Sequence, residues 1–294
     1  MSENNEYDYL LERKLKSEAP ELHTRFKDTV LMVGHLLSRY RLLFPEYTDH
    51  SELHSVTVID ACNRLIGPKQ IDKLNVDEIF VLLMASYLHD VGMGIGENEY
   101  EEFKDKMDEK GYFEKHPDAT RADFVRTYHN EFSGLFIDKY ADLFDLPSKE
   151  HTFAVRQVAR GHRKTDLYDE KEYPVDLTLP NGNTVCLPYL AALIRLADEI
   201  DVVATRNPLV LYDIDALTDE VEIVENKKVQ AIRSMDTTDD AFTLKAKTDE
   251  EDIYEGIVEM VGKMQKTLDY CREVTEKRTG FVISQKKVIL NRLH

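Results

Sequence analysis

The chain of 294 residues contains no tryptophan, only three cysteines and far fewer basic than acidic side chains. Cys62, Cys186 and Cys271 are widely spaced and form no Cys-x-x-Cys pair, which argues against a thiolate zinc site and fits a reducing compartment. Lys and Arg number 38 against 56 Asp and Glu, a formal net charge of -18, so an extended nucleic-acid interface is disfavoured. A local cationic site could still bind one phosphorylated small molecule against this background.

Long apolar runs are missing as well. No run is long enough to span a bilayer, and the acidic N-terminal stretch 1–8 has no secretory signal, so we expect a cytoplasmic protein without a membrane contact. Twelve glycines and nine prolines form no flexible linker. A hydrophobic content of 42% is enough for a substantial core.

Helical periodicity dominates the first two-thirds of the sequence. Apolar residues three and four apart predict amphipathic helices, and one stretch that is apolar on nearly every side predicts a central buried helix over 77–89. Ser148 is the expected N-cap of a later helix. The predicted helices cover residues 21–43, 49–66, 77–89, 120–144, 148–160 and 188–197, with a charged helical lid over 96–118.

The strand signals lie later in the chain. Residues 176–187 alternate around Asn181-Gly182 and predict a short β-hairpin. The fold class is therefore mostly α: a helical bundle with a hairpin over 1–206, followed by a small α+β subdomain over 207–294 that could cap the site, make an oligomer or regulate it. Within that subdomain we expect strands at 208–212, 228–233 and 241–247, a helix at 250–279 and an extended stretch at 281–290.

The doublet His89-Asp90 ends the buried helix and is followed at once by Val91-Gly92. A buried imidazole and carboxylate are costly unless a cation or a partner compensates them. Four other residues at or near helix ends offer similar ligands: His54, His129, His162 and Asp198. Imidazole and carboxylate ligands without thiolate suit Mn, Fe, Ni, Co or Zn at a hydrolytic centre. His50 is an alternative to His54, but it lies nearer the helix start, so we favour His54.

The order His, His-Asp, His, His, Asp resembles the HD-domain superfamily of metal-dependent phosphohydrolases in its five-histidine, binuclear form. The segments that carry the resemblance are Tyr47–Val56, Tyr87–Met93, Val125–His129, Arg160–Arg163 and Leu193–Asp201. They extend over about residues 45–206. The flanking residues also resemble the branch of this superfamily found among bacterial conflict-system and phage-defence effectors.

The resemblance implies an HD-type helical bundle with two divalent ions. One ion would be held by His54, His89, Asp90 and Asp198, and Asp90 would bridge to a second ion held by His129 and His162. Asp90 and His129 are then the expected catalytic residues, and a hydroxide shared by the two ions would be the nucleophile.

Basic residues beside these ligands are candidates for binding substrate phosphate. They are Arg126, Arg163, Lys164 and Arg206, and their alternative role is to form surface ion pairs. Asp201 lies three residues after Asp198, where it could orient a ligand histidine or cap the helix.

Our leading hypothesis is cleavage of a phosphoester in a nucleotide or a nucleotide-derived signal, in a setting that could include anti-phage defence. The alternatives are a dNTP triphosphohydrolase, a di-iron oxygenase and a nucleotide-sensing regulator with a vestigial site. Gly92-Met93 after the doublet, and the absence of Gly-Tyr-Pro after His162, disfavour a cyclic-di-GMP phosphodiesterase. We expect a homo-oligomer with a nucleotide-like substrate, and an effector or protein partner could bind the C-terminal subdomain.

Overall fold

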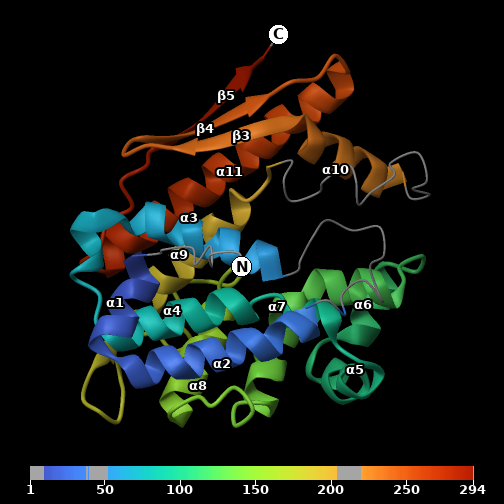
Figure 1. Cartoon of the computed structure of the whole chain (residues 1–294). Coiled ribbons are helices and arrows are strands. Elements are labelled where there is room, and N and C mark those ends of the chain that lie inside the picture. The colour runs from blue at the N-terminus through green and yellow to red at the C-terminus, as the bar shows by residue number, and fades with distance from the viewer. Residues whose placement is uncertain (1–9, 38, 40–51, 204–219, 294) are drawn as a thin grey trace, which may run out of the picture.

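The computed structural model describes residues 10–37, 39, 52–203 and 220–293. Helices predominate, with a hairpin of two short strands and a three-stranded sheet, so the predicted mostly-α class with a C-terminal α+β part is confirmed (Figure 1). The helices before the sheet are α1 (Leu10–Glu18), α2 (Pro20–Leu37), α3 (Glu52–Ile71), α4 (Val76–Leu88), η2 (Val91–Gly94), α5 (Glu97–Phe103), η3 (Lys104–Lys106), α6 (Glu109–Lys115), α7 (Arg121–Lys139), α8 (Lys149–Arg160) and α9 (Leu187–Glu199). The hairpin strands are β1 (Leu177–Thr178) and β2 (Thr184–Val185).

Helix α4 is the centre of the bundle, and α1, α2, α3, α8 and α9 pack around it. Its start is fixed by a capping box, because the Asn75 side chain accepts from the backbone N–H groups of Asp77 and Glu78 while Glu78 accepts from the Asn75 N–H. The second carboxylate oxygen of Glu78 accepts from Cys186 N–H, which also fixes the start of α9. Helix α4 therefore ends at a defined point in the interior, where His89 follows.

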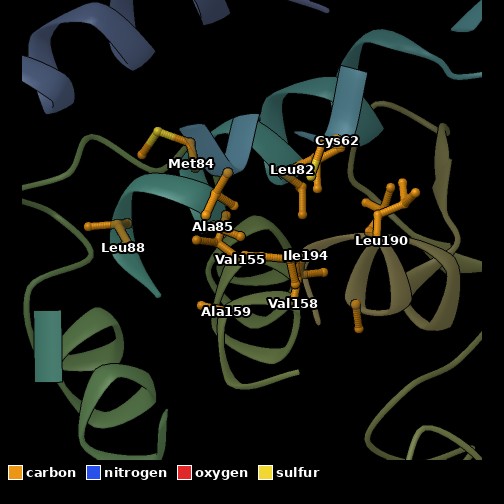
Figure 2. Packing of buried hydrophobic residues seen from close by; sticks show 14 of the residues in the cluster. Cys62, Leu82, Met84, Ala85, Leu88, Val155, Val158, Ala159, Leu190 and Ile194 are labelled. Carbon is orange, nitrogen blue, oxygen red and sulfur yellow. The ribbon is translucent and has the colours of Figure 1, made fainter. Parts of the chain in front are cut away.

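The core around α4 is closely packed. Figure 2 shows Leu82, Met84, Ala85 and Leu88 of α4 among apolar side chains of α3, α8 and α9, and every one of these four is fully buried. Truncating one such leucine to alanine costs about 2–5 kcal/mol, because the transfer free energy is lost and a cavity remains. The core thus provides a rigid frame for the side chains at the helix ends.

The C-terminal part contains α10 (Glu220–Ala231), β3 (Ile232–Thr237), β4 (Ala241–Ala246), α11 (Glu251–Arg278) and β5 (Lys287–Arg292). Strand β4 is central, antiparallel to β3 and parallel to β5. Helix α11 lies between this sheet and the helical bundle, and packs on α9 (Figure 1). Its buried Leu268, Cys271 and Val274 belong to the same core cluster as α4 and α9.

Some predicted elements differ from those observed. The strand expected at 228–233 is wrong over its first four residues, because residues up to Ala231 are helical and the strand begins at Ile232. A short apolar run does not distinguish a helix from a strand by period alone, and packing beside α11 decides it here. Helix α7 ends at Lys139 rather than 144, the lid 96–118 divides into α5, η3 and α6, and α1 was not predicted.

Three sequence-based expectations cannot be compared with the structure. The strand at 208–212 and the residues His50 and Arg206 lie outside the described residues. In the described ranges, no single helix combines the length and apolar composition of a membrane span. Two consecutive helical segments, Val76–Gly94 and Glu97–Lys106, meet these criteria only when they are taken together, and the chain bends by 97° between them.

Candidate metal centre

The six predicted metal ligands come from five helices and converge in one region of the interior. His54 lies in the first turn of α3, and His89 and Asp90 directly follow α4. His129 lies within α7, where the backbone leaves helical geometry at Tyr128 (φ -114°, ψ 17°). His162 follows the end of α8, and Asp198 lies in the last turn of α9. The structure brings them together as two groups: His54, His89 and Asp198, and Asp90, His129 and His162.

The first group surrounds the Nε2 atom of His54. This atom lies 3.1 Å from His89 Nε2 and 3.2 Å from an Asp198 carboxylate oxygen. Both imidazoles are buried, whereas the Asp198 side chain is 20% exposed. Asp198 is therefore the ligand of this group that a molecule from solvent can approach.

The second group is buried throughout. The Nε2 atoms of His129 and His162 are 2.9 Å apart, and they lie 3.5 and 3.6 Å from the Oδ1 atom of Asp90. The other carboxylate oxygen of Asp90, Oδ2, lies 3.3 Å from His89 Nε2 and 3.5 Å from His54 Nε2. Each oxygen of Asp90 thus faces one group, which is the geometry of a carboxylate shared between two cation sites.

The hydrogen bonds of the Nδ1 atoms determine the tautomers of three histidines. The Nδ1 atoms of His89, His129 and His162 lie 2.6–2.9 Å from the backbone carbonyls of Ser86, Arg126 and Ala159, respectively. A carbonyl oxygen only accepts, so Nδ1 carries the proton and the neutral ring presents an unshared pair at Nε2. The unshared electron pairs of His129 and His162 face each other, because the Nε2 atoms of the two rings are 2.9 Å apart. This arrangement is unfavourable alone and is relieved by a cation between them, so the residues present fit a metal ion.

The pKa shifts of these groups favour the forms that bind a metal ion. Burial lowers the pKa of His129 and lowers that of His162 well below its usual value, which keeps both rings neutral near pH 7. For Asp198, burial raises the pKa, but the neighbouring His54 outweighs it and holds this pKa well below its usual range. Neutral imidazole and ionised carboxylate are the forms that bind cations.

Asp201 lies just beyond α9 and fixes the orientation of His54. Its Oδ2 atom is 2.6 Å from His54 Nδ1 and also accepts a hydrogen bond from the Thr57 hydroxyl at 2.8 Å. A carboxylate on the distal nitrogen directs Nε2 of the ring toward the metal site and makes it a stronger ligand. Asp201 is only 6% exposed, so solvent does not compete for this contact.

Gly92 lets the doublet and α7 approach each other closely. A Cβ atom at Gly92 would lie 2.2 Å from the carbonyl oxygen of His129 and 2.6 Å from the backbone nitrogen of Ser133. Ser133 joins the two segments, because its hydroxyl donates to the His89 carbonyl at 2.5 Å and accepts from Gly92 N–H at 2.9 Å. Only glycine permits this spacing, which holds His129 opposite Asp90.

Two cavities lie beside the centre. The larger, of about 1180 Å³, lies against α6 and α7; Arg126, Arg163 and Lys164 line it, but none of the six candidate ligands does. The smaller, of about 680 Å³, lies against α9 and α11 and opens on His162 and Asp198, one ligand from each group. The smaller cavity is therefore the one with direct access to the centre.

The predicted phosphate-binding residues differ in placement. Arg163 and Lys164 are exposed, line both cavities and form no ion pair within the parts of the chain that the structure describes. Arg126 is half-buried and lines only the larger of the two cavities. The four aromatic residues spaced four apart on α7 also differ in placement. Phe124, Phe132 and Phe136 are buried in the core, whereas Tyr128 lines the larger cavity.

Several residues near the centre were not found from the sequence. Thr57 and Ser133 are small polar residues of a common kind, and no local pattern marks them. The side chains of Lys263, Lys266 and Tyr270 line the smaller cavity from α11, more than 60 residues beyond Asp201, where the last segment that resembles HD domains ends. The sequence does show that these residues are spaced three and four positions apart, which places them on one helix face beside the apolar stripe of α11 and could have identified them.

No curated protein matches the chain. The HD-CE family model matches residues 44–278, well over half the chain and including all six candidate ligands. HD-type domains are generally metal-dependent phosphohydrolases, and the buried His and Asp groups here could hold metal. The two groups contain four histidines among the described residues, so the five-histidine form and the number of ions stay predictions. With this match and this arrangement of ligands, the chain belongs to the HD-CE family of HD-type domains.

Proposed function

We propose that this protein is a phosphohydrolase that uses two divalent transition-metal ions, held by His54, His89, Asp90 and Asp198 on one side and by Asp90, His129 and His162 on the other. The observation that supports this most strongly is the position of Asp90, whose two carboxylate oxygens face different pairs of imidazole Nε2 atoms. When bound, such ions polarise a phosphoryl oxygen and lower the pKa of water toward neutrality.

The chain's own residues supply binding and orientation. The backbone carbonyls and Asp201 fix the direction of each imidazole, and burial keeps His129 and His162 neutral so that they act as ligands rather than acids. Arg163 and Lys164 stand next to His162 at the cavity entrance, where they bind the phosphate of a nucleotide-like substrate. No serine or cysteine of this region is needed as a nucleophile.

The test is metal analysis followed by a substrate panel. The purified protein should bind about two ions per chain when supplied with Mn, Fe, Co, Ni or Zn salts, and should hydrolyse bis(p-nitrophenyl) phosphate or members of a nucleotide panel. Asp90→Ala should lose at least about 100-fold in kcat, because both sites lose a ligand.

The matched control is Asp60→Ala, which removes an exposed carboxylate of α3 that pairs with Arg64 on the surface. It should retain both the bound metal and the activity. Equal hydrolysis by wild type and Asp90→Ala, or no bound ion under metal-replete conditions, refutes the proposal. Iron-dependent oxygen consumption without phosphoester cleavage would instead identify the di-iron oxygenase.

The cellular role that we propose is phage defence, which rests on the sequence resemblance alone. Cells that express the wild-type protein should give fewer plaques than cells that express Asp90→Ala. Equal plaque counts at matched protein levels refute this role but leave the hydrolase proposal in place.

A further inference from the structure

The smaller cavity is walled on one side by the C-terminal helix α11. Lys263, Lys266 and Tyr270 are spaced three and four residues apart, so they share one helix face. Opposite them, Arg195 and Asp198 share a face of α9, the helix on which α11 packs. The volume of about 680 Å³ is in the range of small-molecule sites. A substrate at the metal centre therefore lies against α11 as well as against the helical bundle.

The loop that follows α8, residues 161–167, is held by hydrogen bonds from α9 and α11. The guanidinium of Arg195 donates to the Gly161 carbonyl at 2.7 Å and to the Thr165 carbonyl at 2.9 Å. Tyr270 of α11 lies beside this guanidinium, 5.2 Å from it to the ring centre, and its hydroxyl accepts from Leu167 N–H. Arg195 is thus engaged in structure, whereas the loop carries Arg163 and Lys164 to the edge of the cavity.

The lysines of α11 are not engaged in this way. Lys263 and Lys266 are exposed, and neither forms an ion pair or side-chain hydrogen bond with any described residue. Lys277 on the same helix is instead bonded to Glu273, and Lys228 to Glu225. Basic side chains outnumber acidic ones at this cavity: Arg163, Lys164, Arg195, Lys263 and Lys266 line it together with Asp166, Asp198 and Glu199. Glu199 interacts electrostatically with Arg163 and Lys263, so it offsets part of this positive charge.

The lysines of α11 add positive charge on a different wall of the cavity from Arg163 and Lys164. A cationic cleft with walls of low dielectric constant concentrates the field and recruits polyanions. Arg163 and Lys164 lie next to the ligand His162, whereas the lysines of α11 come from the opposite wall. Two separate pairs of cations suit a substrate with two or more linked phosphates.

We infer that Lys263 and Lys266 form an anion subsite that binds phosphates beyond the scissile one, so that the substrate class is the nucleoside polyphosphates. The subsite extends the proposed metal centre and rests on that function. It assigns a specificity-determining role to the C-terminal part of the chain, because α11 supplies the second pair of cations.

The test measures binding separately from turnover. Inorganic tripolyphosphate and orthophosphate are titrated by calorimetry into the full chain, with Mn²⁺ in excess over total phosphate. Wild type should bind tripolyphosphate at least about tenfold more tightly than orthophosphate, and Lys263→Ala/Lys266→Ala should lose that preference. Lys277→Ala, an exposed lysine on the same helix outside the cavity, should keep it. Unchanged preference in the double variant refutes the subsite.

Kinetics provide the second measurement. In the double variant KM for a nucleoside triphosphate should rise about tenfold, with a smaller change in kcat, and Lys263→Glu/Lys266→Glu should raise it further. An unchanged KM also contradicts the subsite. If instead the proposed function is wrong, Asp90→Ala turns over substrate as fast as wild type. The dependence of tripolyphosphate binding on Lys263 and Lys266 is still measured in that case, so the two failures can be distinguished.

Discussion

Replacing Gly92 by alanine should damage the second ligand group selectively. The new methyl carbon would lie 2.2 Å from the His129 carbonyl oxygen, whereas ordinary contacts begin near 3.4 Å, so η2 and α7 must separate by about 1.2 Å. Overpacking of this kind costs about 1–3 kcal/mol of the free energy of unfolding. Metal–ligand distances tolerate only about 0.2 Å, so the shift removes His129 from the site opposite Asp90.

The assay combines urea unfolding with metal analysis. Gly92→Ala should unfold at lower urea concentration and bind about one Mn²⁺ ion fewer per chain than wild type, because the group around His54 does not depend on α7. The control is Gly262→Ala in α11, where a Cβ atom meets nothing within 4 Å. Removing a helical glycine there should stabilise the protein by about 0.5–1 kcal/mol. Wild-type stability and metal content in Gly92→Ala would falsify the close-approach argument.

Three further predictions follow from buried polar groups. Asp201→Asn should weaken metal binding about 10- to 100-fold, measured by competition with a chromogenic chelator, because His54 loses its carboxylate partner; unchanged affinity contradicts that role. Asp77→Asn should cost about 1–3 kcal/mol at neutral pH in urea unfolding, because this buried carboxylate accepts three side-chain hydrogen bonds. Burial raises the Asp77 pKa, but these bonds outweigh it and lower the folded-state pKa below 3.8. The stabilisation is therefore present above pH 3.8 and disappears as the pH falls through the folded-state pKa. A difference in stability between wild type and variant that does not change with pH contradicts this. Burial raises the pKa values of Cys186 and Cys271 to about 12, so thiol reagents should label the folded protein only as fast as it unfolds, and rapid labelling in native buffer would contradict their burial.

Asp77 shows how far local sequence reasoning extends. The acidic first turn of α4 is visible in the sequence, and a carboxylate there favours the helix start. In the structure it also binds His151 of α8 at 3.0 Å and the side chains of Asn181 and Asn183 in the hairpin. His151 had no visible role in the sequence, because its partner lies 74 residues away and nothing local indicates that pairing.

The sequence by itself determined the helical bundle, the hairpin and the identity of the six candidate ligands. Helical period and caps are local properties, and ligands at helix ends can be recognised by residue type and order. The resemblance implied that Asp90 bridges two groups, but only the tertiary structure shows which of its oxygens faces which imidazoles, because this depends on how η2, next to Asp90, packs on α7. The tertiary structure also decided that α11 lines the cavity beside His162 and Asp198. That contact joins Lys263 to residues 101 and 65 positions earlier in the chain, and packing of the C-terminal helix on α9, rather than any local pattern, brings them together.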